Sequence, residues 1–357
     1  MAGGIGSRFW PMSRETQPKQ FLDILGTGRS LIQMTYDRLS RMVPNENIVV
    51  VTQERYRGLV HEHLEQLPAE NVLCEPFMRN TAPCIAYANH WVANKSGDRA
   101  SEAVMIVAPS DHLILKEDDF IEIVQVAAQH SLSTNQLVTL GIKPSRPDTG
   151  YGYIQFEDLP DAGDGRIRSV KTFTEKPQRE LAEQFIASGD FYWNSGIFIW
   201  SLQNITTAFE KHLPEMQDLF QERARAFSTP GEKSAIQLIY GDCENISIDY
   251  GIMEKAPNVA VVLSDFGWSD LGTWGSLHEK LALDEQGNGT TGAELWAHDA
   301  AGNVVATDAA EAKKLVAIRG LNDFIVVDTN DALLICPKSE EQWIKQLVTE
   351  MKTRKTR

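Results

Sequence analysis

Short apolar runs alternate with segments of helical pattern through the first half of the chain. The apolar runs predict buried strands at 48–51, 72–74, 104–107 and 137–140. The segments between them predict helices over about 54–67, 81–94 and 118–130. Strands that alternate with helices predict an α/β fold with a doubly wound, mixed and mostly parallel sheet. Ligands of such sheets bind at the carboxyl ends of the strands, so the loops after Cys74 and Val107 are candidate site segments.

The pattern changes twice in the second half of the chain. Further strands are expected at 150–154, 167–174 and 191–200, followed by helices up to about 240. After Gly289 we expect short alternating strands at 303–306, 315–318, 324–327 and 333–336, and a final helix over 340–351. We therefore expect a catalytic domain at 1–288, with an insert at about 150–270, and a small β-rich domain at 289–357. No regular internal repeat is evident, and the tail is expected to serve assembly or lid packing.

Charge and composition narrow the classes of partner. The 357-residue chain is 42% hydrophobic and 23% charged, as in an ordinary globular protein. Its formal net charge of −15 argues against nucleic acid or an anionic membrane surface as a partner. A polyanionic substrate then requires local cations and a divalent metal. Scattered cysteines without a C-x-x-C pair, and no signal or membrane-spanning stretch, favour a cytoplasmic protein.

The opening segment GGIGSRFWP carries the strongest chemical signal. Its glycines leave backbone N–H groups bare, and Arg8 and Lys19 add two cations, so the loop can surround phosphate oxygens. It is neither the dinucleotide fingerprint nor a Walker loop. A phosphate loop normally follows a buried strand, yet only Met1 and Ala2 precede Gly3. We expect the lack of this central strand to weaken the sheet and loosen the loop.

Two acidic residues are candidate metal ligands. Asp111 follows the strand at 104–107, and Asp270 lies in the Trp- and Gly-rich segment FGWSDLGTW. Carboxylates at such positions can hold a hard cation against a phosphate. Each residue can instead cap a helix, since Ser and Asp are common N-caps, and the spacing alone does not show that the two acids meet.

Three more segments offer polar groups to a ligand. Glu75 follows a strand and can accept a hydrogen bond from a guanine amino group. Asn80 and Thr81 can cap the next helix, and capping is the expected role of Thr81. Adjacent Glu175 and Lys176 end a strand, where they point to opposite faces unless the chain bends. Asn194 lies beside a glycine in WNSGIF, which suits sugar hydroxyls or a simple turn.

Taken in order, these segments resemble the sugar-1-phosphate nucleotidyltransferases, and most closely the bacterial mannose-1-phosphate guanylyltransferases. The resemblance rests on GGIGSRFWPMSR, PKQF, EPFMRNTAP, APSDH, TGYGYI, FTEKP, WNSGIFIW, GWSDLGTW and the tail segment GLNDFIVVDTNDALLICP. Any one motif is weak, but so many in order are specific. The resemblance implies a Rossmann-like nucleotidyltransferase fold whose insert binds the sugar.

The resemblance also implies roles for individual residues. Catalytic roles are implied for Arg8, Lys19 and Asp111, and Mg²⁺ binding for Asp111 and Asp270. Contacts to the nucleotide are implied for Gly3, Gly4, Gly6, Ser7, Glu75, Asn80 and Thr81. Contacts to the sugar phosphate are implied for Gly152, Glu175, Lys176 and Asn194.

The implied reaction transfers GMP from GTP to α-D-mannose 1-phosphate and gives GDP-mannose and pyrophosphate. The family's fused isomerase domain needs another domain's length of chain, so we expect guanylyl transfer alone. A different nucleotide or hexose phosphate is one alternative, and a nucleotide-sugar binding subunit without turnover is another. A nicotinamide-dependent oxidoreductase has little support without the dinucleotide fingerprint. A homodimer formed through the β-rich tail is a further expectation.

Overall fold

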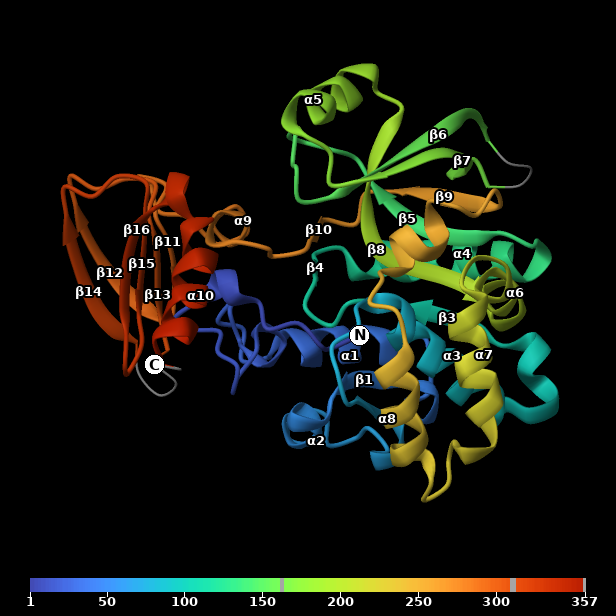
Figure 1. The fold of residues 1–357 in the computed structure, drawn as a ribbon. Helices are drawn as coiled ribbons and strands as arrows, with labels where there is room; N and C mark the ends of the chain where they lie inside the picture. The colour runs from blue at the N-terminus through green and yellow to red at the C-terminus, as the bar shows by residue number, and fades with distance from the viewer. Residues whose placement is uncertain (161–163, 309–312, 356–357) are drawn as a thin grey trace.

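The computed structural model describes residues 1–160, 164–308 and 313–355, and a six-stranded mixed sheet lies at its centre (Figure 1). In spatial order the strands are β3 (Val104–Val107), β8 (Phe191–Ser201), β5 (Leu137–Ile142), β9 (Val259–Ser264), β7 (Ile167–Glu175) and β6 (Gly152–Pro160). Strand β8 runs antiparallel to both β3 and β5, and β5 runs parallel to β9. Strands β3, β5 and β9 therefore share one direction, and β8 is inserted against them.

Helices cover both faces of this sheet because its strands are apolar on both sides. In β8, Phe198 and Trp200 face one core while Ile197 and Ile199 face the other. The first core is completed by helices α3 (Thr81–Ser96), α6 (Leu202–His212), α7 (Pro214–Arg223) and α8 (Glu232–Asp242). The second is completed by α4 (Glu117–Ser133) and α5 (Arg179–Ser188). The expected α/β class with a doubly wound, mixed sheet is confirmed, but β5 and β9 are the only parallel neighbours among the described strands of this sheet, so the expectation that it is mostly parallel does not hold there.

A second, two-stranded sheet extends this architecture on the β3 side. Its strands β1 (Val50–Gln53) and β2 (Val72–Glu75) are parallel, and α1 (Leu31–Ser40) and α2 (Arg57–His63) pack against them. The first two residues lie between the two sheets. The amide of Ala2 donates to Val51 O at 2.8 Å, while the Met1 amino group donates to Ala108 O at 2.9 Å. Met1 and Ala2 thus occupy the place of a strand between β1 and β3.

Beyond Met1 the space between β1 and β3 is a cavity of about 460 Å³. Its walls are mostly apolar and include both strands, Tyr36 from α1, and Ile85 and Trp91 from α3. The cavity continues the line of Met1 and Ala2. It therefore has the position and the lining that suit an additional buried strand.

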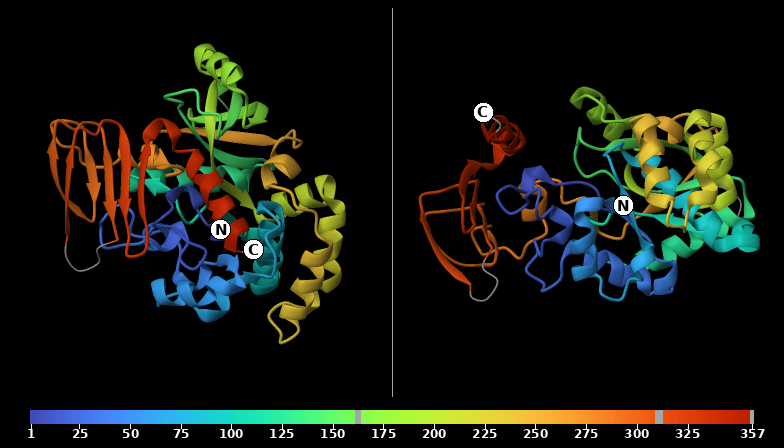
Figure 2. Two further views of the ribbon diagram at one scale, coloured as in Figure 1. Left: turned by 60° about the vertical axis from the view of Figure 1, so that its left-hand side comes forward. Right: turned by 60° about the horizontal axis from the view of Figure 1, so that its bottom comes forward.

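The chain after residue 288 winds into a separate β-rich unit (Figure 2). One sheet contains β11 (Gly289–Thr291), β13 (Val304–Thr307), β15 (Phe324–Asp328) and β16 (Leu333–Pro337). The other contains β12 (Ala293–His298) and β14 (Lys314–Arg319). All neighbouring strands are parallel except β15 and β16, so successive coils stack on one another. Helix α10 (Trp343–Lys355) closes the unit.

The coils of this unit share one short recurrence in the sequence, which is too brief to form a regular repeat. Gly287-Asn288 recurs as Gly302-Asn303, and both glycines have positive φ. Asn303 Nδ2 donates to Asn288 Oδ1 at 2.8 Å, so the two side chains stack at the same corner of adjacent coils. The sequence does not indicate the stacked coils because only this two-residue corner is shared between them.

The expected helix at 54–67 is shorter in the structure. Residues Glu54–Tyr56 form a 3₁₀ turn, and α2 ends at His63 because Leu64 leaves helical dihedral angles. The remaining expected elements are found with shifts at their ends, the largest at the strand expected to end at 154, which continues to Pro160 as β6. Short elements β4 (Leu113–Ile114), β10 (Trp268–Ser269) and α9 (Trp274–His278) connect the units. Among the described residues no helix is long and apolar enough to cross a membrane.

Filling the cavity between β1 and β3 is expected to stabilise the protein. We predict that about five alternating valine and isoleucine residues, joined ahead of Met1, raise the free energy of unfolding by at least ~2 kcal/mol, the order of burying one large aliphatic side chain. Urea unfolding of the extended and original proteins measures this difference. An extension of the same length made of glycine and serine is the control, and equal stabilisation by both extensions would contradict the prediction.

Candidate active site

Lys19 lies at the centre of the candidate site, and its side chain is only 5% exposed. Its Nζ lies 2.8 Å from Asp111 Oδ2 and donates to the carbonyl oxygens of Asp270, at 2.8 Å, and Leu271, at 3.1 Å. An ammonium has three protons, and these three acceptors can use all of them. The structure therefore brings Lys19, Asp111 and Asp270 together from three distant parts of the sequence.

The glycine loop is shaped around the same lysine. Gly6 has a φ of +69°, and a Cβ at this position would lie 2.5 Å from Lys19 Cβ. The Lys19 amide also donates to Ile5 O at 3.1 Å. Gly4 is exposed, with nothing within 4 Å of the position that a Cβ would take. The loop thus holds Lys19 closely at Gly6 while its tip stays open to a ligand.

Asp111 follows β3, at the carboxyl end of the strand. Burial opposes its ionisation, but Lys19 and His112 outweigh that effect and hold the pKa of its carboxyl below the ordinary value. The alternative role as a helix cap is wrong, because Lys116 is the N-cap residue of α4. Asp111 is therefore a carboxylate anchored to the buried lysine.

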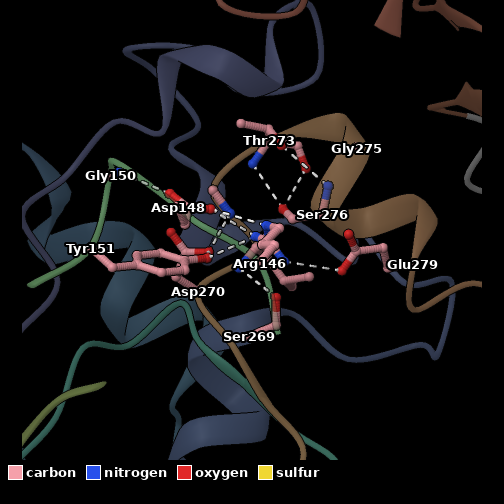
Figure 3. A network of polar contacts seen from close by, with 12 residues as sticks. Arg146, Asp148, Gly150, Tyr151, Ser269, Asp270, Thr273, Gly275, Ser276 and Glu279 are labelled. Carbon is pink, nitrogen blue, oxygen red and sulfur yellow. Dashed lines mark hydrogen bonds and ion pairs between the residues drawn. The ribbon is translucent and has the colours of Figure 1, made fainter. Parts of the chain in front are cut away.

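Asp270 is oriented by a residue that the sequence analysis missed. Tyr151 donates from its hydroxyl to Asp270 Oδ1 at 2.7 Å (Figure 3). The Gly272 amide donates to the same oxygen at 3.0 Å. The Tyr151 ring packs edge-on against Trp193 and Trp268. Burial, and then the Asp270 charge, raise the pKa of Tyr151, so it remains a donor. Asp270 does not cap α9, where Thr273 is the N-cap, so that alternative is also wrong.

Arg146 braces the loop that carries Tyr151. Its guanidinium pairs with Asp148 at 2.9 Å and with Glu279 at 3.4 Å, and it lies 5.9 Å from the centre of the Tyr151 ring. Asp148 also accepts from the Gly150 amide at 2.8 Å, as Figure 3 shows. The sequence analysis identified the motif TGYGYI but assigned no contact to Arg146, Asp148 or Tyr151. These contacts fix Tyr151, and through it Asp270, from the side of the insert.

The two acids have the donor chemistry of a site for a hard cation. No described residue donates to Asp111 Oδ1 or Asp270 Oδ2, which leaves one carboxylate oxygen free on each residue. Among the described residues no group of three or more His, Cys, Asp or Glu side chains could hold a metal. A cation here would therefore take its other ligands from a phosphate ligand and water, as is usual for Mg²⁺.

Arg8 is directed elsewhere. Its Nε donates to Gln342 Oε1 at 3.1 Å, a contact with the C-terminal unit, and no described residue forms an ion pair with it. The neighbouring Phe9 ring lies 5.7 Å from Lys19 Nζ. The structure therefore places the backbone beside Arg8 close to Lys19, but it records no contact of the Arg8 side chain with Asp111 or Asp270.

Glu75 lies at the end of β2, beside the glycine loop. Its Oε1 accepts from the Tyr240 hydroxyl at 2.8 Å, and its Oε2 lies 3.8 Å from the position that a Cβ on Gly3 would take. Burial raises the pKa of Glu75 to about 7, although the Tyr240 hydrogen bond opposes this. The carboxyl group is therefore a buried acceptor next to the loop.

The expected helix cap in this segment is corrected. Asn80, with a φ of +69°, is the N-cap of α3, and its side chain accepts from the Thr81 amide at 3.1 Å. Thr81 Oγ1 instead accepts from the Ile248 amide at 2.8 Å. The sequence could not separate these adjacent residues because either is a common cap.

The segments expected to bind the sugar phosphate also meet. Lys176 has a φ of +48°, so the chain bends there and Lys176 Nζ reaches Glu175 Oε1 at 2.7 Å. The other oxygen of Glu175 is buried without a hydrogen-bond partner. It lies against Gly152, where a Cβ would come within 2.1 Å of it. The absence of a side chain at Gly152 therefore makes room for the Glu175 carboxylate.

Asp249 completes this group and was missed by the sequence analysis. Asn194 donates to Asp249 Oδ1 at 2.9 Å, while its own oxygen accepts from Thr139 and from the Gly196 amide. Burial and the Glu175 charge raise the pKa of Asp249 to about 6. The Asn194 amide group has two N–H donors and Asp249 takes one of them, so one N–H remains for a ligand. The segment IDYGIM offered no spacing signal, because only folding brings it to Asn194.

The chain is similar to known proteins along nearly its whole length. Residues 1–287 match the nucleotidyl transferase family, and residues 297–351 match the MannoseP isomerase/GMP-like beta-helix domain. The chain is 38% identical to a mannose-1-phosphate guanylyltransferase of Klebsiella pneumoniae, over 99% of this chain and 73% of that protein. It is 37% identical to the xanthan biosynthesis protein XanB of Xanthomonas campestris pv. campestris, over 99% and 72% of the two chains. A crystal structure of a Thermus thermophilus protein, described as a mannose-1-phosphate geranyltransferase, is 29% identical with a TM-score of 0.86, covering 99% of this chain and 98% of that one.

The raised pKa of Glu75 predicts a pH-dependent stability. Between about pH 4.5 and 7 the folded protein keeps a proton that the unfolded chain releases, so this group lowers the free energy of unfolding as pH rises. Glu75→Gln keeps an acceptor for Tyr240 but cannot ionise. We predict that E75Q is more stable than the original protein at pH 8, by up to ~3 kcal/mol, and that the gap closes at pH 4.5. Urea unfolding at both pH values measures it, and a gap that does not change with pH would contradict the prediction.

Proposed function

We propose the reaction of this chain from one premise: the chain belongs to the mannose-1-phosphate guanylyltransferase family of nucleotidyl transferases. The proposed reaction transfers GMP from GTP to α-D-mannose 1-phosphate. A phosphate oxygen of the sugar phosphate forms a bond to the α-phosphorus of GTP. The bond from that phosphorus to the β-phosphate oxygen breaks, and pyrophosphate leaves. The products are GDP-mannose and pyrophosphate.

The observation that carries this proposal is the position of Lys19. The buried ammonium lies beside the glycine loop and between Asp111 and the Asp270 backbone. The attacking phosphate oxygen is already ionised at neutral pH, so the reaction needs no general base. Catalysis then depends on alignment and on stabilising the negative charge that develops. Lys19 and Arg8 supply positive charge, and the amides at Gly3, Gly4, Gly6 and Ser7 bind phosphate oxygens.

We assign the cofactor as Mg²⁺, held by Asp111 and Asp270. The free oxygen on each carboxylate fits this ion, which prefers a few carboxylates together with water and substrate phosphates. When bound, Mg²⁺ supplies charge stabilisation to the phosphates. Tyr151 and the Gly272 amide keep the Asp270 carboxylate in one orientation, and Lys19 does the same for Asp111.

The two substrates are assigned to opposite sides of this centre. Glu75, with Asn80 and Thr81, is proposed to face the guanine, where an ionised Glu75 accepts from the N1–H and the amino group. On the insert, Glu175 is proposed to accept from the sugar hydroxyls, and Gly152, Lys176 and Asn194 to contact the sugar or its phosphate. The division into domains at 1–288 and 289–357 is part of the same proposal.

A nucleotide comparison tests the proposed reaction. Pyrophosphate release with Mg²⁺ and mannose 1-phosphate is measured with GTP, UTP, dTTP and ATP, and then with other hexose 1-phosphates. We expect release with GTP and mannose 1-phosphate at the highest kcat/KM. Preference for another pair would select the alternative transferase. The absence of release with every pair would favour the non-catalytic binding subunit.

Removing the central charges is predicted to slow catalysis. We expect Lys19→Ala and Asp111→Ala each to lower kcat by at least ~100-fold, the scale of losing one preorganised charge contact. Initial rates of pyrophosphate release measure this effect, with circular dichroism to show that each variant is folded. Lys116→Ala is the matched control, because Lys116 forms an exposed ion pair with Asp265. A rate near that of the original protein would remove the residue from the mechanism.

The assembly is proposed to be a cytoplasmic homodimer formed through the C-terminal unit. Leu333 and Ile335 on β16 are 59% and 54% exposed, and β16 is the last strand of its sheet. We predict that Leu333→Lys combined with Ile335→Lys converts a dimer to a monomer in gel filtration. Leu132→Lys on α4 is the control, since Leu132 is also exposed but lies outside this unit. An unchanged elution volume for the double variant would exclude this surface as the interface.

A further inference from the structure

The C-terminal segment at 341–344 is wedged between the phosphate loop and α9. Ile344 is completely buried in a core that also contains Phe9, Trp274 and Leu277. The Glu341 carboxylate accepts from the Gly275 amide at 2.8 Å, near the N-terminus of α9. Figure 1 shows α10 beside the N-terminal segment. The apolar contacts and this hydrogen bond hold the backbone on either side of Gln342, whose own side chain is exposed.

Gln342 makes the one contact that the structure records for the Arg8 side chain within the described ranges. Its Oε1 accepts from Arg8 Nε at 3.1 Å. This contact uses one of the five N–H donors of the guanidinium and leaves the two terminal nitrogens for another acceptor. Those nitrogens are the pair best suited to a phosphate.

The acceptor that Arg8 contacts is neutral. The next arginine, Arg14, forms an ion pair with Asp331 at 2.6 Å, whereas no described carboxylate pairs with Arg8. The residue before Gln342 is an acid, Glu341, but its carboxylate accepts from the Gly275 amide instead of pairing with Arg8. Gln342 therefore orients Arg8 without cancelling the positive charge that a phosphate would need.

We propose that Gln342 is a positioning residue for Arg8, so that the C-terminal unit contributes to the geometry of the phosphate site. This inference rests on the proposed function, in which Arg8 binds the nucleotide phosphates. Gln342 acts on the reaction only through Arg8. The exposed Arg14–Asp331 pair adds little, since such pairs contribute at most about 1 kcal/mol. Ile344 is buried in the same core as Phe9, which packs the two segments together.

A double-mutant cycle tests this role. Gln342→Ala is expected to lower kcat/KM for GTP by about 5- to 10-fold, as loss of one oriented hydrogen bond would. The KM for mannose 1-phosphate is expected to stay unchanged. Arg8→Ala is expected to lower kcat/KM for GTP further. In the double variant, the Gln342→Ala change is expected to add nothing to the loss caused by Arg8→Ala.

The control is Gln346→Ala, since Gln346 is an exposed glutamine four residues farther on, in the first turns of α10. Thermal unfolding of each variant shows that the fold is kept. If Gln342→Ala matches the original protein, or lowers kcat/KM equally with and without Arg8, the proposal is overturned. The proposed function fails by a different result, namely no pyrophosphate release by the original protein with GTP and mannose 1-phosphate.

Discussion

The site depends on how a buried ammonium group is satisfied. Taking Lys19 out of water is costly unless acceptors replace its hydration. Asp111 and the carbonyl oxygens of the adjacent residues Asp270 and Leu271 do so, and these acceptors come from two segments far from Lys19 in the sequence. The loop can pass this close to Lys19 only because Gly6 has no side chain. One buried charge therefore fixes the phosphate loop, the end of β3 and the segment after β10 against one another.

Asp270 links this centre to the two other parts of the molecule. Its carboxylate is held by Tyr151, which belongs to the insert and is braced by Arg146. Four residues farther on, α9 begins at Trp274, which shares a core with Phe9 and with strands of the C-terminal unit. The segment that carries Tyr151, the Asp270 carboxylate and the C-terminal unit are thus connected through contacts a few residues apart.

The antiparallel direction of β8 places the residues of the insert next to the candidate site. Because β8 runs antiparallel between β3 and β5, its first residues lie at the carboxyl ends of those two strands, on the same side of the sheet as Asp111. Asn194 on β8 therefore meets Asp249, and Glu175 at the end of β7 lies against Gly152 at the start of β6. The strands of the insert therefore belong to the main sheet and do not form a separate lid.

Alternation of apolar runs and helical segments was enough to predict the α/β class and most strand positions, because burial on both faces leaves a local pattern in the chain. The sequence also allowed us to predict the glycines and cations of the opening segment, and Asp111 after β3, as site residues. Their candidate chemistry depends on residues that are neighbours in the sequence. The direction of β8, the partners of Lys19 and the roles of Tyr151, Asp249 and Gln342 were not readable. Each of these depends on contacts between residues far apart in the chain, and such contacts exist only once the sheet and the C-terminal unit have packed. The local pattern thus determined the elements and the candidate chemistry, and tertiary packing decided which side chains meet, because a hydrogen bond or ion pair needs atoms in contact.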